Sequence, residues 1–483
     1  MNIFPIEPLR QAFLSLPEQQ QQSGDTPIEM QYFYVPLSHA KALHPDSVLV
    51  EGIRGSGKSE WWLELLDENR RKLVAEFSPR AELINIQCSA GFGQIRSSHY
   101  PDKKILGVLL KTIDAQTIWN TIVAWTILGT TKFGLSTEAL WGERVNHYQT
   151  NFETLDNQLV KIDSELQQQN KKHIVLFDAL DRTADDWKSL KELLKGLLQV
   201  ALDFRSFRAI RLKIFVRPDM LEDAYVYSFP DGSKLISNKV SLEWTKLELF
   251  NLLWQYLGNA EKGGKEFRDH CYQDFRQEWK QHPDFNVWII PDEMRKDEAL
   301  QRKVFHAIAG EWMGPNAQRG NTYTWLPNHL GDSYGKVSPR SFLAALREAA
   351  TDNLVKDQKY PLSYQAIKKG VQKASAIRVN ELKEDYRWIE TLITPLKGMS
   401  VPCHFEAIAN IWKQQDIQGK LQNINVEGVR LPPSRLEQGY EGIKQDLVDL
   451  GIFEVMRDGR INMPDVYRVG YGLGRKGGVK PVR

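Results

Sequence analysis

The chain has 483 residues, of which 42% are apolar and 26% are charged, and its formal net charge is +2. This composition is that of an ordinary globular protein and argues against a disordered or low-complexity chain. The three cysteines lie far apart and form no CxxC pair, which argues against a disulfide framework or a zinc site and favours a reducing cytoplasm. The N-terminus also lacks the basic start and apolar run of a signal peptide.

Two further features bear on membranes and polyanions. The most apolar region, residues 105–129, is interrupted by Lys111, Asp114 and Asn120. It falls short of the roughly 18 uninterrupted apolar residues of a membrane span, so we expect a buried helix and no membrane association. Residues 356–483 hold 21 Lys/Arg and 15 Asp/Glu, which favours a polyanionic or acidic partner there, although a solvated surface explains the excess equally well.

Strand and helix patterns alternate through the first half of the chain. Strands are expected at 31–37, 47–53, 82–88, 173–182 and 211–219, and helices at 58–72 and 187–202. A hairpin is expected at 225–236, around Pro230-Asp231-Gly232. Strands that alternate with helices predict an α/β fold, a parallel sheet with helices on both faces.

A glycine-rich loop joins the strand at 47–53 to the helix at 58–72. The run GIRGSGKS matches the phosphate-loop pattern GxxxxGK[ST]. Glycines let backbone N–H groups turn toward phosphates, and the helix N-terminus adds partial positive charge. We expect Lys58 to reach the β- and γ-phosphates and Ser59 to bind Mg²⁺; a purely structural glycine turn is the alternative. The predicted ATP/ADP-binding residues are Gly52, Arg54, Gly55, Ser56, Gly57, Lys58, Ser59 and Glu60.

An acidic residue follows the apolar run IVLF. Asp178 stands at the expected carboxyl end of this strand, where open α/β sheets place their ligands. It is the predicted metal-site acid, together with Ser59. Asp181, three residues on, is the candidate for orienting the attacking water or accepting its proton. The alternative for both aspartates is capping of the following helix.

These residues carry a family resemblance. Ala179 directly after Asp178, with Asp181 two residues further on, resembles the Walker B motif of NACHT-type NTPases. The ending Leu-Asp-Arg is still more similar to that of KAP-type NTPases. Both types belong with the STAND group of signal-transducing P-loop ATPases, which are relatives of AAA+ proteins. The resemblance covers roughly residues 46–350.

The same resemblance assigns roles to two arginines. FVRP at 215–218 is similar to the sensor 1 segment, and VSPRSF at 337–342 resembles the sensor 2 motif. It implies that Arg217 and Arg340 sense the γ-phosphate and assist catalysis, because a guanidinium stays charged and binds phosphate oxygens bidentately. An ion pair of Arg217 with Asp219 or Asp223 is the alternative. Arg182 is a candidate for a finger that points at a neighbouring subunit.

The chain also departs from these families. Ala179 stands where AAA+ ATPases have their catalytic glutamate, so Asp181 must substitute for it or hydrolysis is slow. Arg182 replaces the acid common in NACHT proteins. The membrane insertions frequent in KAP proteins and the repeat array of large STAND receptors are not visible in the sequence.

The C-terminal region has a readable order of elements. Residues 435–464 predict a helix, a strand, an Asp-Gly turn and a return strand, an order that resembles the last helix and wing of a winged-helix domain. The expected organisation is an N-terminal arm and strand region at 1–45, a P-loop NTPase core at 46–240, a helical lid at 241–350 and a winged-helix-like region at 351–483.

Two functions are consistent with this organisation. The first is a STAND-like switch that binds ATP and hydrolyses it slowly, acting with partner protein subunits; the resemblance implies a bacterial defence or signalling system. The second is a DNA-binding AAA+-type ATPase, similar to origin-binding or transposition regulators, favoured by the basic C-terminal region. A homo-oligomer is expected in either case.

Overall fold

The structure is a computed structural model that describes residues 4–17, 27–352, 359–426 and 431–475. The described residues form two compact units. One unit is Leu37–Glu243. The other joins the N-terminal segments 4–17 and 28–36 to the residues from Trp244 onward. Pro27 also belongs to the first unit, so among the described residues the chain passes between the units at 27/28, 36/37 and 243/244.

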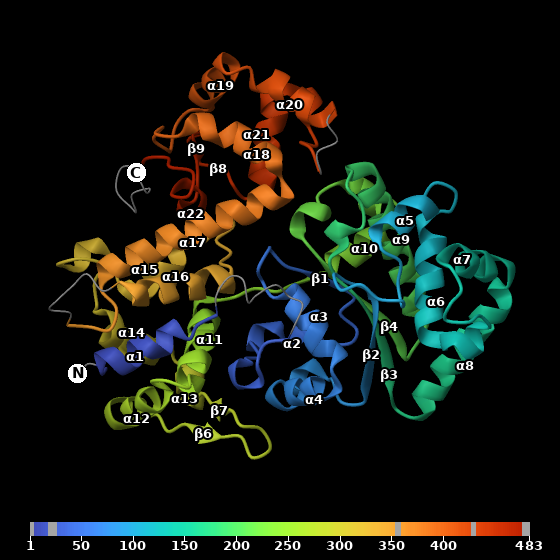
Figure 1. The fold of residues 1–483 in the computed structure, drawn as a ribbon, viewed down its shortest axis with the longest axis horizontal. Helices are drawn as coiled ribbons and strands as arrows, with labels where there is room; N and C mark the ends of the chain where they lie inside the picture. The colour runs from blue at the N-terminus through green and yellow to red at the C-terminus, as the bar shows by residue number, and fades with distance from the viewer. Residues whose placement is uncertain (1–3, 18–26, 353–358, 427–430, 476–483) are drawn as a thin grey trace. The chain divides into compact units, whose positions relative to one another are not determined.

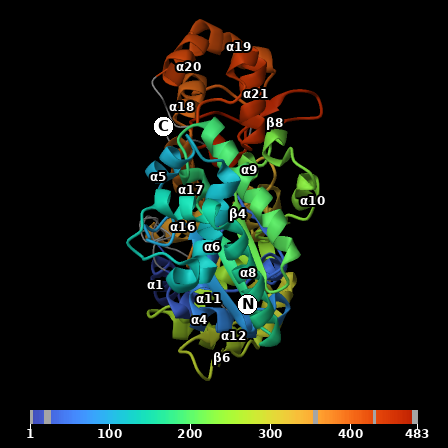
Figure 2. The same ribbon diagram turned by 90° about the vertical axis from the view of Figure 1, so that its right-hand side faces the viewer.

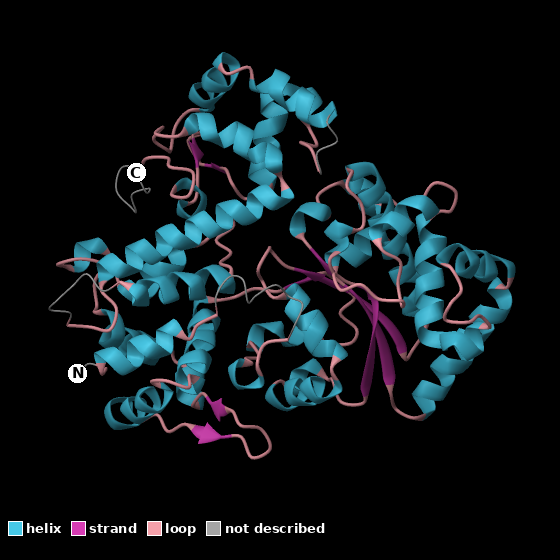
Figure 3. Cartoon of the chain, viewed as in Figure 1, coloured by secondary structure: helices cyan, strands magenta, loops and turns pink. Residues whose placement is uncertain are grey.

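The unit Leu37–Glu243 is built on a five-stranded sheet, drawn in magenta in Figure 3. The strands are β1 (Leu49–Glu51), β2 (Ile86–Phe92), β3 (Lys172–Phe177), β4 (Ile210–Val216) and β5 (Val240–Ser241), in the order β2-β3-β4-β1-β5. Every neighbouring pair is parallel. Strand β4 thus lies between β1, which precedes the glycine-rich loop, and β3, which precedes Asp178. The predicted α/β fold with a parallel sheet is confirmed.

Helices cover both faces of this sheet (Figures 1 and 2). One face carries α2 (Ala40–Leu43), α3 (Lys58–Leu66) and α4 (Glu68–Phe77), and the other carries α6 (Ala115–Phe133), α8 (Phe152–Gln168) and α9 (Trp187–Asp203). Helix α9 shows why the sequence folds in this way: Leu190, Leu193, Leu194 and Leu197 recur at helical spacing and all are buried. Helices α5 (Lys103–Leu109), α7 (Trp141–Thr150) and α10 (Gly232–Ser237) complete the unit.

Several local predictions were wrong. The single buried helix expected at 105–129 is α5 and the start of α6, because Asp114 caps α6 by accepting a hydrogen bond from the Thr117 N–H. The predicted helix 58–72 is two helices, because Asp67 is extended and its side chain caps α4 by accepting a hydrogen bond from the Arg70 N–H. Residues 31–37 form no strand; a 3₁₀ turn spans Met30–Tyr32. The predicted hairpin at 225–236 is a 3₁₀ turn followed by α10, since the Asp231-Gly232 turn chemistry serves here to start a helix.

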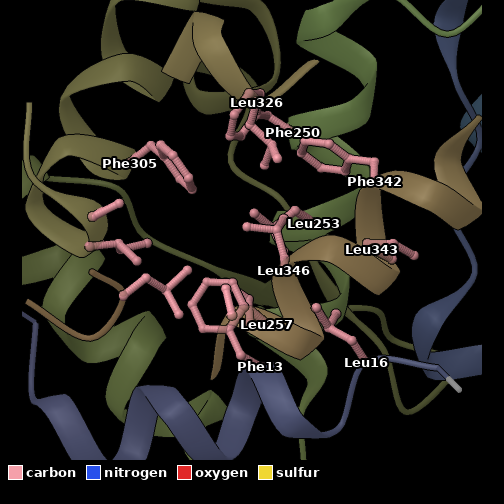
Figure 4. Packing of buried hydrophobic residues seen from close by; sticks show 14 of the residues in the cluster. Phe13, Leu16, Phe250, Leu253, Leu257, Phe305, Leu326, Phe342, Leu343 and Leu346 are labelled. Carbon is pink, nitrogen blue, oxygen red and sulfur yellow. The ribbon is translucent and has the colours of Figure 1, made fainter. Parts of the chain in front are cut away.

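The second unit is helical around one apolar core. It contains α1 (Ile6–Leu14), α11 (Lys246–Asn259), α12 (Gly264–Phe275), α13 (Asp292–Lys296), α14 (Glu298–Ala309), α15 (Thr322–Asn328), α16 (Pro339–Thr351) and α17 (Tyr364–Asp385), with a small hairpin of β6 (Lys280–Gln281) and β7 (Trp288–Ile289). Figure 4 shows side chains of α1, α11, α14, α15 and α16 that meet in this core. The ring centroid of Phe250 lies 4.9 Å from that of Phe305 and 5.2 Å from that of Phe342.

The last part of this unit follows the predicted order of elements. After α18 (Arg387–Ile393), α19 (Phe405–Gln414) and α20 (Ile417–Val426) come α21 (Gly439–Asp449), β8 (Glu454–Val455) and β9 (Ile461–Asn462), then α22 (Asp465–Arg468). Strands β8 and β9 are antiparallel, and Cys403 forms a further antiparallel bridge to Ile461. No helix in the described part of the chain is long and apolar enough to cross a membrane.

Candidate nucleotide site

The glycine-rich loop connects β1 to α3, as its spacing predicts. Gly55 and Gly57 have φ values of 77° and 99°, in the left-handed region that favours glycine. At Gly52 the constraint is space, since an added Cβ would lie 2.3 Å from the Ser56 Oγ. Gly57 is the N-cap of α3 and supplies no side-chain cap, so the first N–H groups of the helix face the loop. This is the local geometry of an anion-binding helix start.

Lys58 begins α3 and folds back over the loop. Its Nζ donates hydrogen bonds to the carbonyl oxygens of Gly52 at 2.7 Å and Ile53 at 3.0 Å. Burial lowers the pKa of Lys58 to about 8; the Asp178 carboxylate opposes this shift, while the Arg217 cation adds to it. These carbonyl contacts are neutral, so phosphate oxygens would offer the half-buried ammonium group a negatively charged hydrogen-bond partner in their place.

Asp178 follows β3 and is 1% exposed. It shares a hydrogen bond with Ser59, and among the described residues its Oδ2 atom has no hydrogen-bond partner. Burial raises the pKa of Asp178, against the effects of Ser59 and Lys58. A buried carboxylate oxygen without a donor, beside a hydroxyl, fits the oxygen ligands that Mg²⁺ prefers. In the described residues no cluster of three or more His, Cys, Asp or Glu forms a further metal site.

Two more predicted residues lie at the same edge of the sheet. Asp181 is in a 3₁₀ turn, Leu180–Arg182, just after Asp178, and Arg217 directly follows β4. The Arg217 Nη1 lies 3.6 Å from the Asp181 Oδ2. Arg217 also forms a two-pronged ion pair with Asp219, with 3.0 Å from Nε to Oδ1 and 2.9 Å from Nη2 to Oδ2. Asp223 pairs with Lys191 instead.

Arg340 belongs to the other unit, where it lies in the first turn of α16 as predicted. Its Nη1 lies 2.9 Å from Oε1 of the buried Glu381 in α17, and Arg378 lies 3.4 Å from Oε2 of the same carboxylate. Arg182 is exposed at the surface of the core. Arg54 and Glu60 are half-buried in and just after the loop, and Ser56 is buried.

The alternative predicted for Arg217, an ion pair with Asp219 or Asp223, is present with Asp219. Sequence reasoning missed one residue near this site, Tyr100. Tyr100 lies close enough to Asp178 for the carboxylate to contribute to raising its pKa to about 12, mainly through burial. No local pattern marks Tyr100, because the loop that carries it is far from Asp178 in sequence.

The parallel sheet, the loop between β1 and α3, and the acidic residue after β3 define the class: the core is an α/β P-loop NTPase fold. No family model matches the chain, and no curated protein matches it. Two solved structures have low similarity. The ORC2 protein of Aeropyrum pernix, in ADPNP–ADP complexes, is 12% identical, with a TM-score of 0.32 over 97% of this chain and 100% of that chain. The Cdc6p protein of Pyrobaculum aerophilum is 13% identical, with a TM-score of 0.29 over 94% and 93%. At this low similarity, neither structure bears on the roles of the site residues.

Proposed function

We propose that this chain is an ATPase that binds ATP with Mg²⁺ at the β1–α3 loop and uses the nucleotide state to do conformational work. One observation carries the proposal. The half-buried Lys58 and the buried Asp178 oxygen without a donor face the same loop as Ser59, so the site has a cation and a metal ligand that nucleotide and Mg²⁺ would satisfy together. A structural glycine turn has no use for either group.

The residues of the chain take distinct parts in this proposal. The loop N–H groups and Lys58 hold the phosphates, with Lys58 exchanging its carbonyl contacts for phosphate oxygens. Ser59 and Asp178 would hold Mg²⁺, which supplies charge neutralisation on the phosphates when it is bound. Asp181 orients the attacking water or accepts its proton, and Arg217 stabilises charge on the γ-phosphate. Arg340 is proposed as the second sensor.

Ala179, the residue directly after Asp178, favours slow turnover. Ala179 has φ 54°, in the left-handed region, and its methyl group cannot accept a proton. Asp181 must then act from the next turn of the chain. We therefore place this protein among ATPases in which the bound state matters more than the rate of hydrolysis.

A DNA-acting ATPase of the AAA+ type is the first candidate for the output. The order α19, α21, β8, β9, with the bridge from Cys403 to Ile461, favours a winged-helix-like end, and the region carries an excess of basic residues. The charges on α21 are mostly paired: Lys444 with Glu441 in the same helix, and Asp449 with Arg435, which precedes the helix. We therefore assign the DNA contact to the turn of the β8–β9 hairpin, where Arg457 is exposed.

A STAND-like switch is the second candidate, supported by the sequence of the Asp178–Arg182 segment and by the slow turnover proposed from Ala179. In this role the chain would act with partner subunits, for example in a bacterial defence system. Prolonged retention of ADP distinguishes this candidate from a freely cycling ATPase.

The first test is the nucleotide that the purified protein retains after denaturation, compared with Lys58→Ala. About one ADP per chain, lost in the variant, supports the site and favours the switch. The DNA-acting ATPase is favoured if the site is empty and double-stranded DNA stimulates hydrolysis. Arg457→Glu should then abolish the stimulation by DNA. Equal nucleotide content and equal hydrolysis in wild type and Lys58→Ala would contradict the ATPase proposal itself.

A further inference from the structure

The chain makes a sharp turn directly after β4. Arg217 is extended, Pro218 fixes the next φ, and a 3₁₀ turn covers Pro218–Met220. This turn folds Asp219 back on Arg217, so that both oxygens of the carboxylate meet the Nε and Nη2 edge of the guanidinium. The two side chains are only 11% and 13% exposed. A bidentate pair of this kind fixes the plane of the guanidinium as well as its position.

The remaining edge of the guanidinium points to the site. Nη1 lies 3.6 Å from the Asp181 Oδ2, longer than an ordinary N–H···O hydrogen bond. One cation thus lies between two carboxylates, tightly bound by Asp219 and loosely by Asp181. Asp219 also contributes to the field at Lys58, whose pKa it raises along with Asp178 and Asp181.

We propose that Asp219 is a positioning residue that anchors Arg217 and keeps its guanidinium from closing onto Asp181. The inference rests on the proposed ATPase function. Without the Asp219 carboxylate, the nearby Asp181 carboxylate, 3.6 Å away, can draw the guanidinium into a close pair, and this pair would occupy the carboxylate needed for the attacking water. Arg217 would at the same time turn away from the γ-phosphate. Asp219 therefore sets the geometry of both groups without contacting the nucleotide.

A purely structural clamp makes a different prediction. If the Asp219–Arg217 pair only closes the turn Pro218–Met220, its loss lowers the thermal stability and leaves the rate per folded molecule unchanged. Positioning instead changes kcat, because the misplaced groups act in the transition state, and leaves KM nearly unchanged. The loss must also depend on the presence of Arg217.

The experiment compares the ATPase kinetics of Asp219→Asn, Arg217→Ala and the double variant in the full chain. We expect Asp219→Asn to lower kcat about tenfold or more, with KM within about twofold. The double variant should be no slower than Arg217→Ala alone. Asp223→Asn is the matched control: this aspartate is on the same segment but pairs with Lys191, and its variant should keep the wild-type rate.

Three results would overturn the inference: an unchanged kcat in Asp219→Asn, losses that multiply in the double variant, or equal kcat in Asp219→Asn and Asp219→Glu. The glutamate variant retains the anion and should retain more of the rate. Thermal unfolding of each variant verifies folding. Lys58→Ala distinguishes failure of the ATPase proposal from failure of the role of Asp219. If Lys58→Ala hydrolyses ATP as fast as wild type, the ATPase proposal is refuted. If Lys58→Ala loses the rate and Asp219→Asn keeps it, only the role of Asp219 is refuted.

Discussion

The two compact units treat their buried charges in different ways. At the carboxyl edge of the sheet, Asp178 has a buried oxygen without a donor among the described residues, and the half-buried Lys58 is bonded to neutral carbonyls. In the helical unit, the buried Glu381 is shared by two arginines, Arg340 and Arg378. Burial of an uncompensated charge is costly, so the first arrangement needs a ligand and the second does not.

This difference also separates the two predicted sensor arginines. Arg217 is anchored through Nε and Nη2 to both oxygens of the Asp219 carboxylate. Arg340 shares its carboxylate with Arg378, so its departure would leave Glu381 with a counter-ion. The contrast predicts a fixed arginine at the proposed nucleotide site and a detachable one in the helical unit.

Asp178→Asn is expected to have the largest effect. It removes a proposed metal ligand, so hydrolysis should fall by at least about a hundredfold. The same change removes a buried charge whose pKa is raised, so the nucleotide-free protein should become more stable, with a thermal midpoint higher by about 2 °C or more. Steady-state ATPase assays and calorimetry measure the two effects.

A neighbouring aspartate supplies the control. Asp185 is in the segment that follows Asp181, is exposed, and pairs only on the surface with Lys103. Asp185→Asn should change neither quantity appreciably. If Asp178→Asn lowers the stability as well as the activity, then the buried carboxylate of Asp178 does not destabilise the nucleotide-free protein, contrary to this prediction.

Much of this edge was predictable from local patterns, and the rest was not. The loop GIRGSGKS and Asp178 are short motifs whose strand and helix context can be read from neighbouring residues. Glu381 is 41 positions from Arg340, so their pairing depends on how α16 and α17 pack. The anchoring of Arg217 by Asp219 depends on the backbone turn at Pro218, and the left-handed φ of Ala179 is a property of the folded loop. All three features depend on tertiary geometry, which the local conformational propensities of the residues do not encode.

Arg378→Ala tests the helical side of the comparison. It removes the more buried of the two arginines that pair with Glu381 and leaves the partly exposed Arg340 beside it, and loss of a buried partner of this kind should cost about 3 kcal/mol of unfolding free energy. Arg340→Ala leaves Glu381 with Arg378 and should cost less than about 1 kcal/mol. Urea unfolding measures both. Equal costs would show that Arg340 is no more detachable than Arg378.

Glu64→Gln tests the pH dependence of the core. Glu64 is in α3, is fully buried and pairs with Arg70. Burial raises its pKa from 4.5 to about 9, with Arg70 opposing this shift and Glu60 adding to it. Because the folded state holds the proton more tightly, its stabilising effect is complete below pH 4.5 and is lost as the pH rises toward 9.

The expected slope between these limits is at most about 1.4 kcal/mol per pH unit. Glu64→Gln should flatten it, as measured by urea unfolding at a series of pH values between these limits. Glu68→Gln is the matched control on the next helix, since Glu68 is exposed and pairs with Lys72. An identical slope in wild type and Glu64→Gln would exclude Glu64 as the titrating group.

Ala179→Gly is expected to have the smallest effect, and it tests whether the left-handed backbone at Ala179 matters for the site. A left-handed alanine costs about 1 kcal/mol more than glycine, and the greater freedom of glycine in the unfolded chain offsets part of this gain. The variant should therefore be more stable by about 0.5 kcal/mol at most. If strain at Ala179 holds Asp178 and Asp181 in place for the nucleotide, kcat should fall although stability rises. A rate that is unchanged would mean that the two aspartates are held by their own contacts, Ser59 for Asp178 and Arg217 for Asp181, and that the left-handed residue is incidental to the site.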